Sequence, residues 1–165
     1  MARGKAQNRG KSAKTSYMYP SLHQDVMSAV SDEIASPHFH MNDSDSGVYN
    51  TCSTHVMGTF VCNNSTCANH GWASKKVAIL IRGYPRNGYN AVVFNQRCKS
   101  CNKLGTLKMD EESYVDRVAY RLKKWAGVRM EKPSFGRKKG LPHKSELYIA
   151  SSGLKKRASV KQDSL

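Results

Sequence analysis

The sequence contains no long apolar run and few bulky hydrophobic residues. No segment of the 165 residues approaches the ~20 apolar residues that a membrane-spanning helix needs. The first residues also lack the apolar core of a secretory signal, which favours an intracellular protein of the cytoplasm or nucleus. Hydrophobic residues make up 39% of the chain, and this low share predicts that only part of it packs into a domain.

Sequence signatures of catalysis are missing as well. No carboxylate pair, activated nucleophile or phosphate-binding glycine loop stands out, and turn formation explains the glycines of "RGYPRNGYN". We therefore expect a non-enzymatic protein. The five cysteines are an odd number, and without a secretion signal a disulfide scaffold is a poor interpretation. Thiolates that bind a metal in a reducing compartment fit better.

Each sign of charge is absent from one long stretch of the chain. Residues 15–74 contain five acids and no Lys or Arg, whereas residues 75–109 contain eight Lys or Arg and no acid. The first fourteen residues add five basic residues and 117–161 add fourteen, for a net charge of +15. A field of this strength favours polyanionic partners.

Both ends of the chain are basic and poor in apolar residues. We expect residues 1–17 to form a disordered arm, with a mitochondrial presequence as a less favoured alternative because an apolar face is lacking. We expect residues 129–165 to form a largely flexible tail. Its "KKRAS" places basic residues before Ser159, as in sites of basophilic kinases, and resembles a weak nuclear-import signal. A phosphate on this serine would weaken polyanion binding.

The N-terminal part of the remaining chain, residues 18–50, predicts a helix followed by an acidic linker. Apolar residues recur at helical spacing from Leu22 to Ile34, and Ser21 is the expected cap of a helix over about 21–34. The residues after this helix are polar and rich in turn formers.

The next part, residues 51–128, is where we expect the folded domain. Residues 72–84 and 89–98 are β-branched and aromatic runs separated by "PRNG", a hairpin signal. A helix should follow from an N-cap at Asp110 to a stop at Gly127. Its predicted apolar stripe consists of Tyr114, Val118, Leu122 and Trp125.

Two cysteine pairs flank the predicted hairpin. Cys62 and Cys67 are separated by four residues, and Cys98 and Cys101 by two. Zinc prefers four such ligands at tetrahedral corners, so we expect one structural zinc ion with no open position for substrate. Its binding free energy would contribute to folding. Ordinary reduced cysteines are the alternative, and a redox pair at Cys98 and Cys101 is less favoured because no βαβ pattern surrounds it.

The predicted fold class is therefore a small α+β domain. Zinc-ribbon-like antiparallel hairpins are closed by the four-cysteine site and followed by one C-terminal amphipathic helix. Other residues with ligand-like spacing are weaker candidates. We expect His70 to lie beside the site, and Cys52 with His55 to be a chance pair, although a second metal site that uses them or His143 stays open.

Basic residues gather around the cysteine pairs and predict nucleic-acid binding, with RNA favoured. Together with Trp72, the expected contacts are Lys75, Lys76, Arg82, Arg86, Arg97, Lys99 and Lys103. Exposed aromatics would stack unpaired bases, and the further candidates are Tyr84, Tyr89 and Phe94. The alternative for each aromatic is a place in a small core. A second hypothesis is a protein-interaction adaptor in which residues 18–50 bind a partner or fold back on the basic ribbon.

Several motifs resemble the fungal branch of the three-CxxC-type zinc finger family. They are "HGWASKKVAI", "QRCKSC" and "VDRVAYRLKKW", within a resemblance that covers about residues 18–153. Animal relatives with this finger include the zygote arrest proteins, associated with RNA binding and translational control. They also include the receptor-transporting proteins, which act in membrane-protein trafficking.

The resemblance also implies what this chain has lost. Fungal members carry a cysteine after the helix tryptophan, then Pro-His and a third Cys-x-x-Cys. Here those cysteine positions hold Ala126, Tyr148 and Ser151, while His143 is kept. The comparison implies that a second zinc site is absent and that residues 128–153 are looser than in relatives, because no metal offsets their chain entropy.

Overall fold

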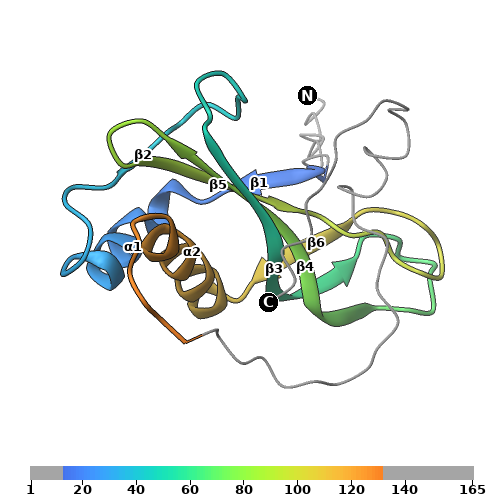
Figure 1. The fold of residues 1–165 in the computed structure, drawn as a ribbon. Helices are drawn as coiled ribbons and strands as arrows, with labels where there is room; N and C mark the ends of the chain where they lie inside the picture. Colours follow the sequence, from blue (N-terminus) through green and yellow to red (C-terminus); the bar gives the residue numbers. More distant parts are fainter. Residues whose placement is uncertain (1–12, 132–165) are drawn as a thin grey trace, which may run out of the picture.

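The structure is a computed structural model, and it describes residues 13–131 (Figure 1). Six strands and two α-helices make up this part of the chain. In order, they are β1 (Ser16–Met18), the 3₁₀ turn η1 (Pro20–Leu22), α1 (His23–Val30), β2 (His38–Phe39), β3 (Asn50–Cys62), β4 (Gly71–Tyr84), β5 (Gly88–Phe94), β6 (Gly105–Met109) and α2 (Glu111–Trp125). Neither helix of this described part is long and apolar enough to cross a membrane.

One sheet contains all the strands, in the order β1-β5-β4-β3-β6. Neighbours in this order are antiparallel, and the short β2 pairs in parallel with β5 beside β1. The long strands β3 and β4 connect the two ends of the molecule (Figure 1). The helices lie at one end, and the loops that carry the cysteines lie at the other.

The β4–β5 hairpin is confirmed, and its turn differs from the expected one. Arg86 and Asn87 both have positive φ, 59° and 60°, as the central residues of a type I′ turn do. The tight turn is therefore Arg-Asn rather than Asn-Gly. It fixes the register in which Tyr84 pairs with Gly88 and Ile79 with Val93.

Strand β3 begins at Asn50, six residues before its first buried apolar residue, Val56. Its register with β4 pairs Val56 with Val77 and then Gly58 with Ser74. Met57 therefore opposes two residues of β4, a β-bulge that leaves the side chains of both Lys75 and Lys76 exposed.

Helix α2 forms as the sequence predicts. The Asp110 side chain accepts a hydrogen bond from the Ser113 backbone N–H at 2.8 Å and caps the helix. Gly127, with a φ of 83°, follows the last turn. Tyr114, Val118 and Leu122 are buried, and Trp125 packs partly buried against the same core.

Helix α1 is shorter than predicted. The chain enters it through the 3₁₀ turn η1, and the α-helix covers only His23–Val30. Ser21 does not cap it, because it lies inside the 3₁₀ turn and no side-chain cap is formed at either helix start.

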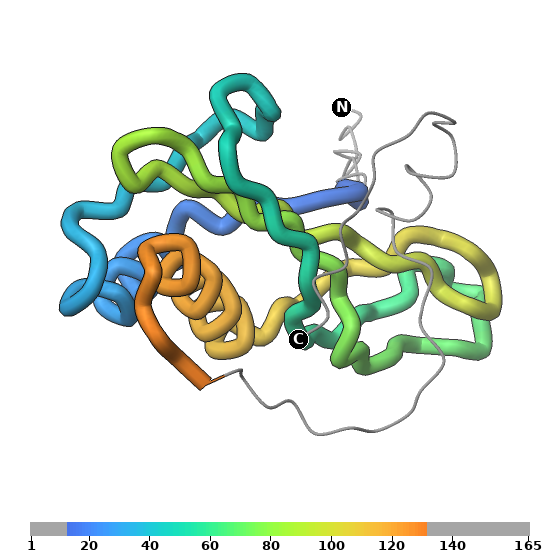
Figure 2. Tube along the Cα trace, in the orientation of Figure 1, coloured from blue at the N-terminus to red at the C-terminus, as the bar shows by residue number. Residues whose placement is uncertain are grey.

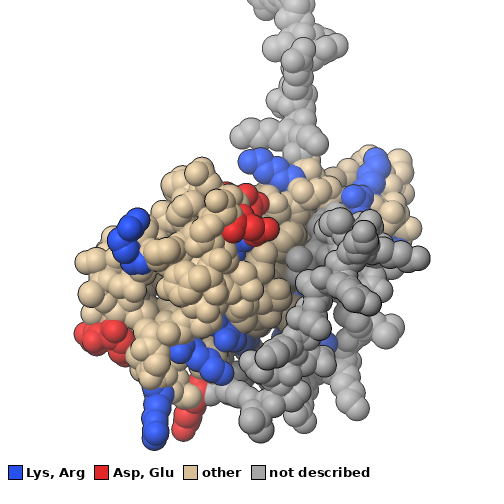
Figure 3. Space-filling view, turned by 45° about the horizontal axis from the view of Figure 1, so that its top comes forward, with Lys and Arg blue, Asp and Glu red and all other residues tan. Residues whose placement is uncertain are grey.

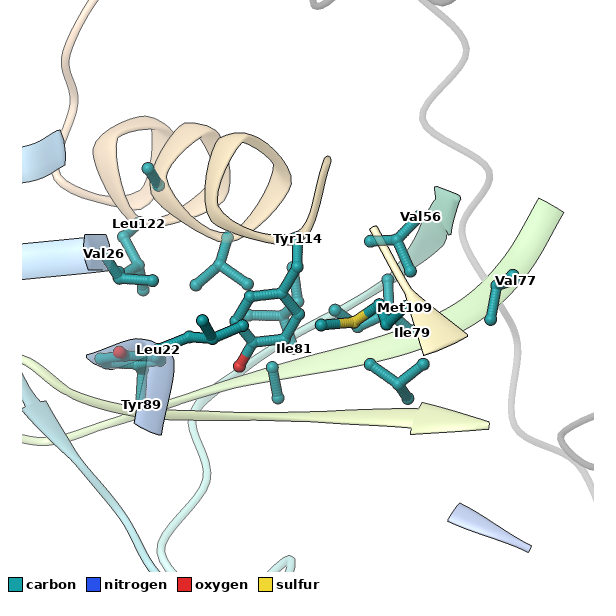
Figure 4. Close-up of a cluster of buried hydrophobic side chains, with 14 of the residues drawn as sticks. Leu22, Val26, Val56, Val77, Ile79, Ile81, Tyr89, Met109, Tyr114 and Leu122 are labelled. Atoms are coloured by element: carbon teal, nitrogen blue, oxygen red, sulfur yellow. The ribbon is translucent and has the colours of Figure 1, made fainter. Parts of the chain in front are cut away.

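Residues 18–50 are part of the same domain, which corrects the predicted boundaries. Leu22 and Val26 are buried in one cluster with Ile79 of the sheet and Tyr114 of α2 (Figure 4). Val30 belongs to the same cluster. The β1 strand, which overlaps the predicted arm of residues 1–17, pairs with β5. The apolar side of α1 is therefore used inside the fold and is not a free docking surface. The predictions for residues 1–12 and 132–165, Ser159 and His143 included, lie outside the described residues.

Candidate metal centre and basic surface

The first cysteine turn follows directly from β3. Cys62 is the last residue of the strand, and its backbone N–H donates to the His70 carbonyl at 3.0 Å. Between them, the Asn64 carbonyl accepts from the Cys67 N–H at 3.0 Å. The Asn64 side chain accepts from the Thr66 hydroxyl at 2.9 Å, so the loop is stabilised by its own polar groups and turns both thiols inward.

The second cysteine turn is held by backbone hydrogen bonds between β5 and β6. The Asn102 N–H donates to the Cys98 carbonyl at 2.8 Å, and the Cys98 N–H donates to the Lys103 carbonyl at 2.9 Å. Asn102 has a positive φ of 62°, which asparagine tolerates better than most residues. The Arg97 guanidinium donates to the Asn102 carbonyl at 3.1 Å across the turn.

The four predicted ligands, Cys62, Cys67, Cys98 and Cys101, come together at one point. Their sulfurs all lie within 4.8 Å of one another. The Cys62 and Cys101 sulfurs are 3.6 Å apart, and those of Cys67 and Cys98 are 3.9 Å apart. A tetrahedral zinc with Zn–S bonds of about 2.3 Å separates its sulfurs by about 3.8 Å. The cluster therefore has the size and the donors of a site for one zinc ion.

The electrostatics of the cluster favour a cation. Backbone N–H groups of Cys101 and Ser100 lower the pKa of the Cys98 thiol to about 6, and the Lys103 N–H lowers the pKa of Cys101. The Asn64 and Asn69 N–H groups act in the same direction on Cys62 and Cys67, but burial and the neighbouring thiols raise the pKa of both thiols overall. Four thiolates this close repel one another, and a divalent cation at their centre offsets that repulsion.

Two buried amides join the cysteine turn to the rest of the domain. Asn95 and Gln96 are fully buried. The Gln96 side chain accepts from Trp72 Nε1 at 3.1 Å and donates to the Lys76 carbonyl at 3.1 Å, at the β-bulge. The Asn95 side chain donates to the Lys14 carbonyl at 2.7 Å and to a β6 carbonyl. Sequence reasoning missed both residues, since only their position two and three residues before Cys98 hinted at a role.

Asparagines outside the predicted set also support the site. The Asn69 side-chain amide donates to the Cys98 sulfur at 3.5 Å. The Asn63 amide donates to the Leu104 carbonyl at 2.9 Å, and its oxygen accepts from the Thr106 hydroxyl at 2.9 Å. These contacts join the two cysteine turns and orient the Cys98 ligand.

The other candidate ligands do not form a second cluster within the described residues. Cys52 and His55 are three residues apart on β3 and so point to opposite faces of the sheet. Cys52 faces α2, where burial raises the pKa of its thiol and Arg121 opposes that change. His70 contributes its backbone carbonyl to the first cysteine turn, and its side chain is exposed.

Most of the predicted stacking aromatics belong to the core. The Trp72 ring stacks on Phe60 with centroids 5.0 Å apart, and it is partly buried. Tyr84 and Tyr89 are 3% and 0% exposed, so neither is available to stack on a base. Phe94 is half-buried in β5.

Arg82, a predicted nucleic-acid contact, lies inside the fold. It is buried, and its guanidinium donates to the carboxylates of Asp43 and Asp45 at 2.7 and 2.8 Å. The acidic linker thus folds back onto β4, where the Tyr84 hydroxyl also donates to the Ser44 carbonyl at 2.6 Å. Arg86 is exposed, but the β4–β5 turn places it at the opposite end of the hairpin from the zinc site.

The remaining predicted basic residues lie at the zinc end. Lys75 and Lys76 are exposed at the β-bulge, and Lys99 and Lys103 are exposed on the second cysteine turn. Arg97 lines an open groove beside them, and no acidic residue is among its lining residues: Ala13, Asn63, Arg97, Asn102, Lys103, Leu104 and Thr106. On the face in Figure 3, the described surface at this end, on the right, shows basic atoms but no acidic ones.

One family of known proteins shares the cysteine site. No curated protein and no solved structure matches the chain. A family model for a zinc-binding domain, the zinc ribbon with three Cys-x-x-Cys pairs, matches residues 55–152. This match covers more than half of the 165 residues and includes all four clustered cysteines. The chain therefore belongs to the zinc-binding 3CxxC-type zinc ribbon family.

Proposed function

We propose that the protein binds nucleic acid, with RNA favoured, through the basic surface of its zinc end. The observation that carries the proposal is the segregation of charge in the folded domain. Lys75, Lys76, Lys99 and Lys103 project from the bulge and the cysteine turn, while Asp43 and Asp45 are paired with Arg82 elsewhere. Such a surface attracts phosphate groups. Asp110 lines a groove with Lys75, so the strongest attraction is expected at Lys99 and Lys103, beside a groove without a carboxylate.

The described part of the chain begins beside the same groove. Ala13 lines the groove with Arg97 and Lys103, and Asn95 holds the Lys14 carbonyl beside it. Residues 1–12, which carry Arg3, Lys5, Arg9 and Lys11, are therefore attached at the groove. A tethered basic segment raises the local concentration of cations around any bound phosphate backbone.

The burial of the aromatic residues determines the kind of binding that we expect. Tyr84 and Tyr89 are in the core, so neither of these described rings can stack on a base. Binding should depend mainly on phosphate contacts and should be steeply salt-dependent with little sequence preference. The resemblance to the zygote arrest proteins supports RNA as the nucleic acid, and an intracellular place of action is part of the proposal.

A salt series with a labelled single-stranded RNA tests the function. We expect the double variant Lys99→Ala/Lys103→Ala to bind more weakly and to lower the slope of log affinity against log salt by up to about 1.4, about 0.7 for each lost phosphate contact. Arg86→Asn, at the far end of the hairpin, is the matched control and should bind like the unmodified protein. If both variants bind alike, or if the unmodified protein does not bind at physiological salt, the proposal is wrong.

A further inference from the structure

Within residues 13–131, one half of β3 has a neighbouring strand on one side only. Residues 58–62 of β3 pair with β6, but the other half, from Asn50 to Val56, pairs with β4 alone. Strand β6 ends at Met109, and α2 starts two residues later and leaves the plane of the sheet. We call the segment from Asn50 to Val56 the open edge.

The backbone groups of alternate residues point away from β4 at the open edge. Met57 fixes this direction, because its carbonyl accepts from the Asp110 N–H at 2.9 Å and its N–H donates to the Ser113 hydroxyl at 3.0 Å. Groups two residues apart point to the same side of a strand. The N–H and C=O groups of Thr51, Ser53 and His55 therefore face outward.

These outward groups have almost no partner in the described part of the chain. Among its hydrogen bonds, the only one that reaches them is a weak contact of 3.8 Å from the Cys52 thiol to the Ser53 carbonyl. All three residues are exposed. They offer a short, regular row of donors and acceptors to another strand.

The open edge also lacks the residues that prevent pairing. Natural edge strands carry Lys, Pro or inward-pointing charges that keep another chain from adding to the sheet. The sequence "NTCSTHV" from Asn50 to Val56 contains no Pro, Lys, Arg, Asp or Glu. Its β-branched Thr51, Thr54 and Val56 favour extended backbone.

A row of cations on α2 lies next to this edge. Arg117, Arg121 and Lys124 are spaced by four and three residues and so share one side of the helix. All three are close enough to Cys52 to oppose the rise in the pKa of its thiol that burial causes. The Arg121 Nε is buried without a hydrogen-bond partner among the described residues.

We propose that the open edge of β3 binds an extended acidic segment of a partner protein by strand addition. The backbone of the segment pairs with Thr51, Ser53 and His55, and its carboxylates on one face meet Arg117, Arg121 and Lys124. Such strand addition takes affinity from main-chain hydrogen bonds and specificity from alternate side chains. A nucleic acid would use the cations but would leave the row of backbone donors and acceptors unpaired, which favours a peptide.

A fluorescent peptide with alternating Glu and Val, as long as the open edge, is the probe for this site. We expect binding to full-length protein by anisotropy, and weaker binding of two control peptides. One control has Lys in place of each Glu, and the other carries N-methyl groups on the amides that would face β3. The first removes charge complementarity, and the second removes hydrogen bonds while it keeps the charge.

Amide hydrogen exchange locates the binding. In the free protein, the amides of Thr51, Ser53 and His55 should exchange rapidly. The amides of Cys52 and Thr54, which alternate with them along β3, should be protected. The Glu–Val peptide should slow the three outward amides by at least about tenfold, as in a paired strand. Protection of these three amides in the free protein would mean that another part of the chain already covers the edge, and the proposal would be overturned.

Two variants test the contacts separately. Ser53→Pro removes one outward N–H at a position where the β4 ladder loses nothing, and Arg121→Ala removes one cation. Each variant should lower the affinity for the peptide by at least about fivefold. Lys75→Ala, at the zinc end, should leave this affinity unchanged. If Ser53→Pro fails to retain zinc, Arg121→Ala and the N-methylated peptide still decide the question. Equal binding of methylated and unmethylated peptide, with full competition by single-stranded RNA, would show a purely ionic surface and reject strand addition.

Discussion

At the scale of single residues, two classes of functional side chain differ in how far the sequence reveals them. The four cysteine ligands follow from spacing alone, because zinc needs thiols of a fixed number and short separations. Asn95 and Gln96 do not, because a buried amide is recognised only by the groups that surround it in the fold. Arg82 was misassigned for the same reason: its partners, Asp43 and Asp45, are remote in sequence.

Gln96 is the residue whose loss should most disturb the link between the bulge and the cysteine turn. Gln96→Ala leaves Trp72 Nε1 and the Lys76 carbonyl without their present partner. We expect a cost of about 2–4 kcal/mol in the free energy of unfolding, from the lost hydrogen bonds of a fully buried amide and the cavity that the shorter side chain leaves. Urea unfolding of the zinc-loaded protein measures it. Lys99→Ala, an exposed neighbour, should change stability by less than about 0.5 kcal/mol, and an equally small change for Gln96→Ala would contradict this role.

At the scale of elements, helix α2 and the β4–β5 hairpin were predictable, because their apolar residues repeat with the period of the element. Most of β3 was not. The side chains that face inward from its first half include Cys52 and Thr54 rather than large apolar residues. The sequence there does not alternate clearly between apolar and polar residues, which is the pattern that predicts a strand. The two-residue β2 depends wholly on its pairing with β5.

The hairpin turn gives a prediction at this scale. Arg86 has a φ of 59°, a conformation that costs most side chains about 1 kcal/mol and glycine almost nothing. Its side chain is exposed, so Arg86→Gly removes strain and no packing. We expect a higher melting temperature, by a few degrees, for about 0.5–1 kcal/mol of added stability. Arg86→Val should lower it, since a β-branched residue is least compatible with positive φ; a lower melting temperature for both variants would refute the turn assignment.

At the scale of the whole molecule, the predicted division at residue 51 fails because of contacts between distant parts of the chain. Strand β1 pairs with β5 across more than 70 residues, as Ser16 lies opposite Phe94. The acidic linker is held by Arg82, and α1 shares a core with α2. An ion pair of 3.5 Å also joins Lys123 of α2 to Glu33, in the turn after α1. Local periodicity carries no information about such pairings. Figure 2 shows the result, a chain whose N-terminal segment runs along the sheet and then packs beside α2.

A single core predicts a single unfolding transition. Val26 of α1 is fully buried in the core that α1 shares with the sheet and α2. Val26→Ala should lower the free energy of unfolding by about 2 kcal/mol. Because α1 and the zinc ribbon share this core, the lost stability should lower the unfolding midpoint equally, whether unfolding is followed by Trp fluorescence or by zinc release. Gln24→Ala, on the exposed side of the same helix, is the control. A variant that lowers only the helical signal, with zinc release unchanged, would restore the two-domain description.

The most direct test of the account is the zinc content of the purified full-length protein by native mass spectrometry, compared with Cys98→Ser. The four clustered sulfurs predict one zinc ion per chain. Structural zinc sites supply much of the folding free energy of small domains, so the variant should lose the metal and, with it, the folded state. Two zinc ions per chain, or a Cys98→Ser protein that stays fully folded without zinc, would contradict the account.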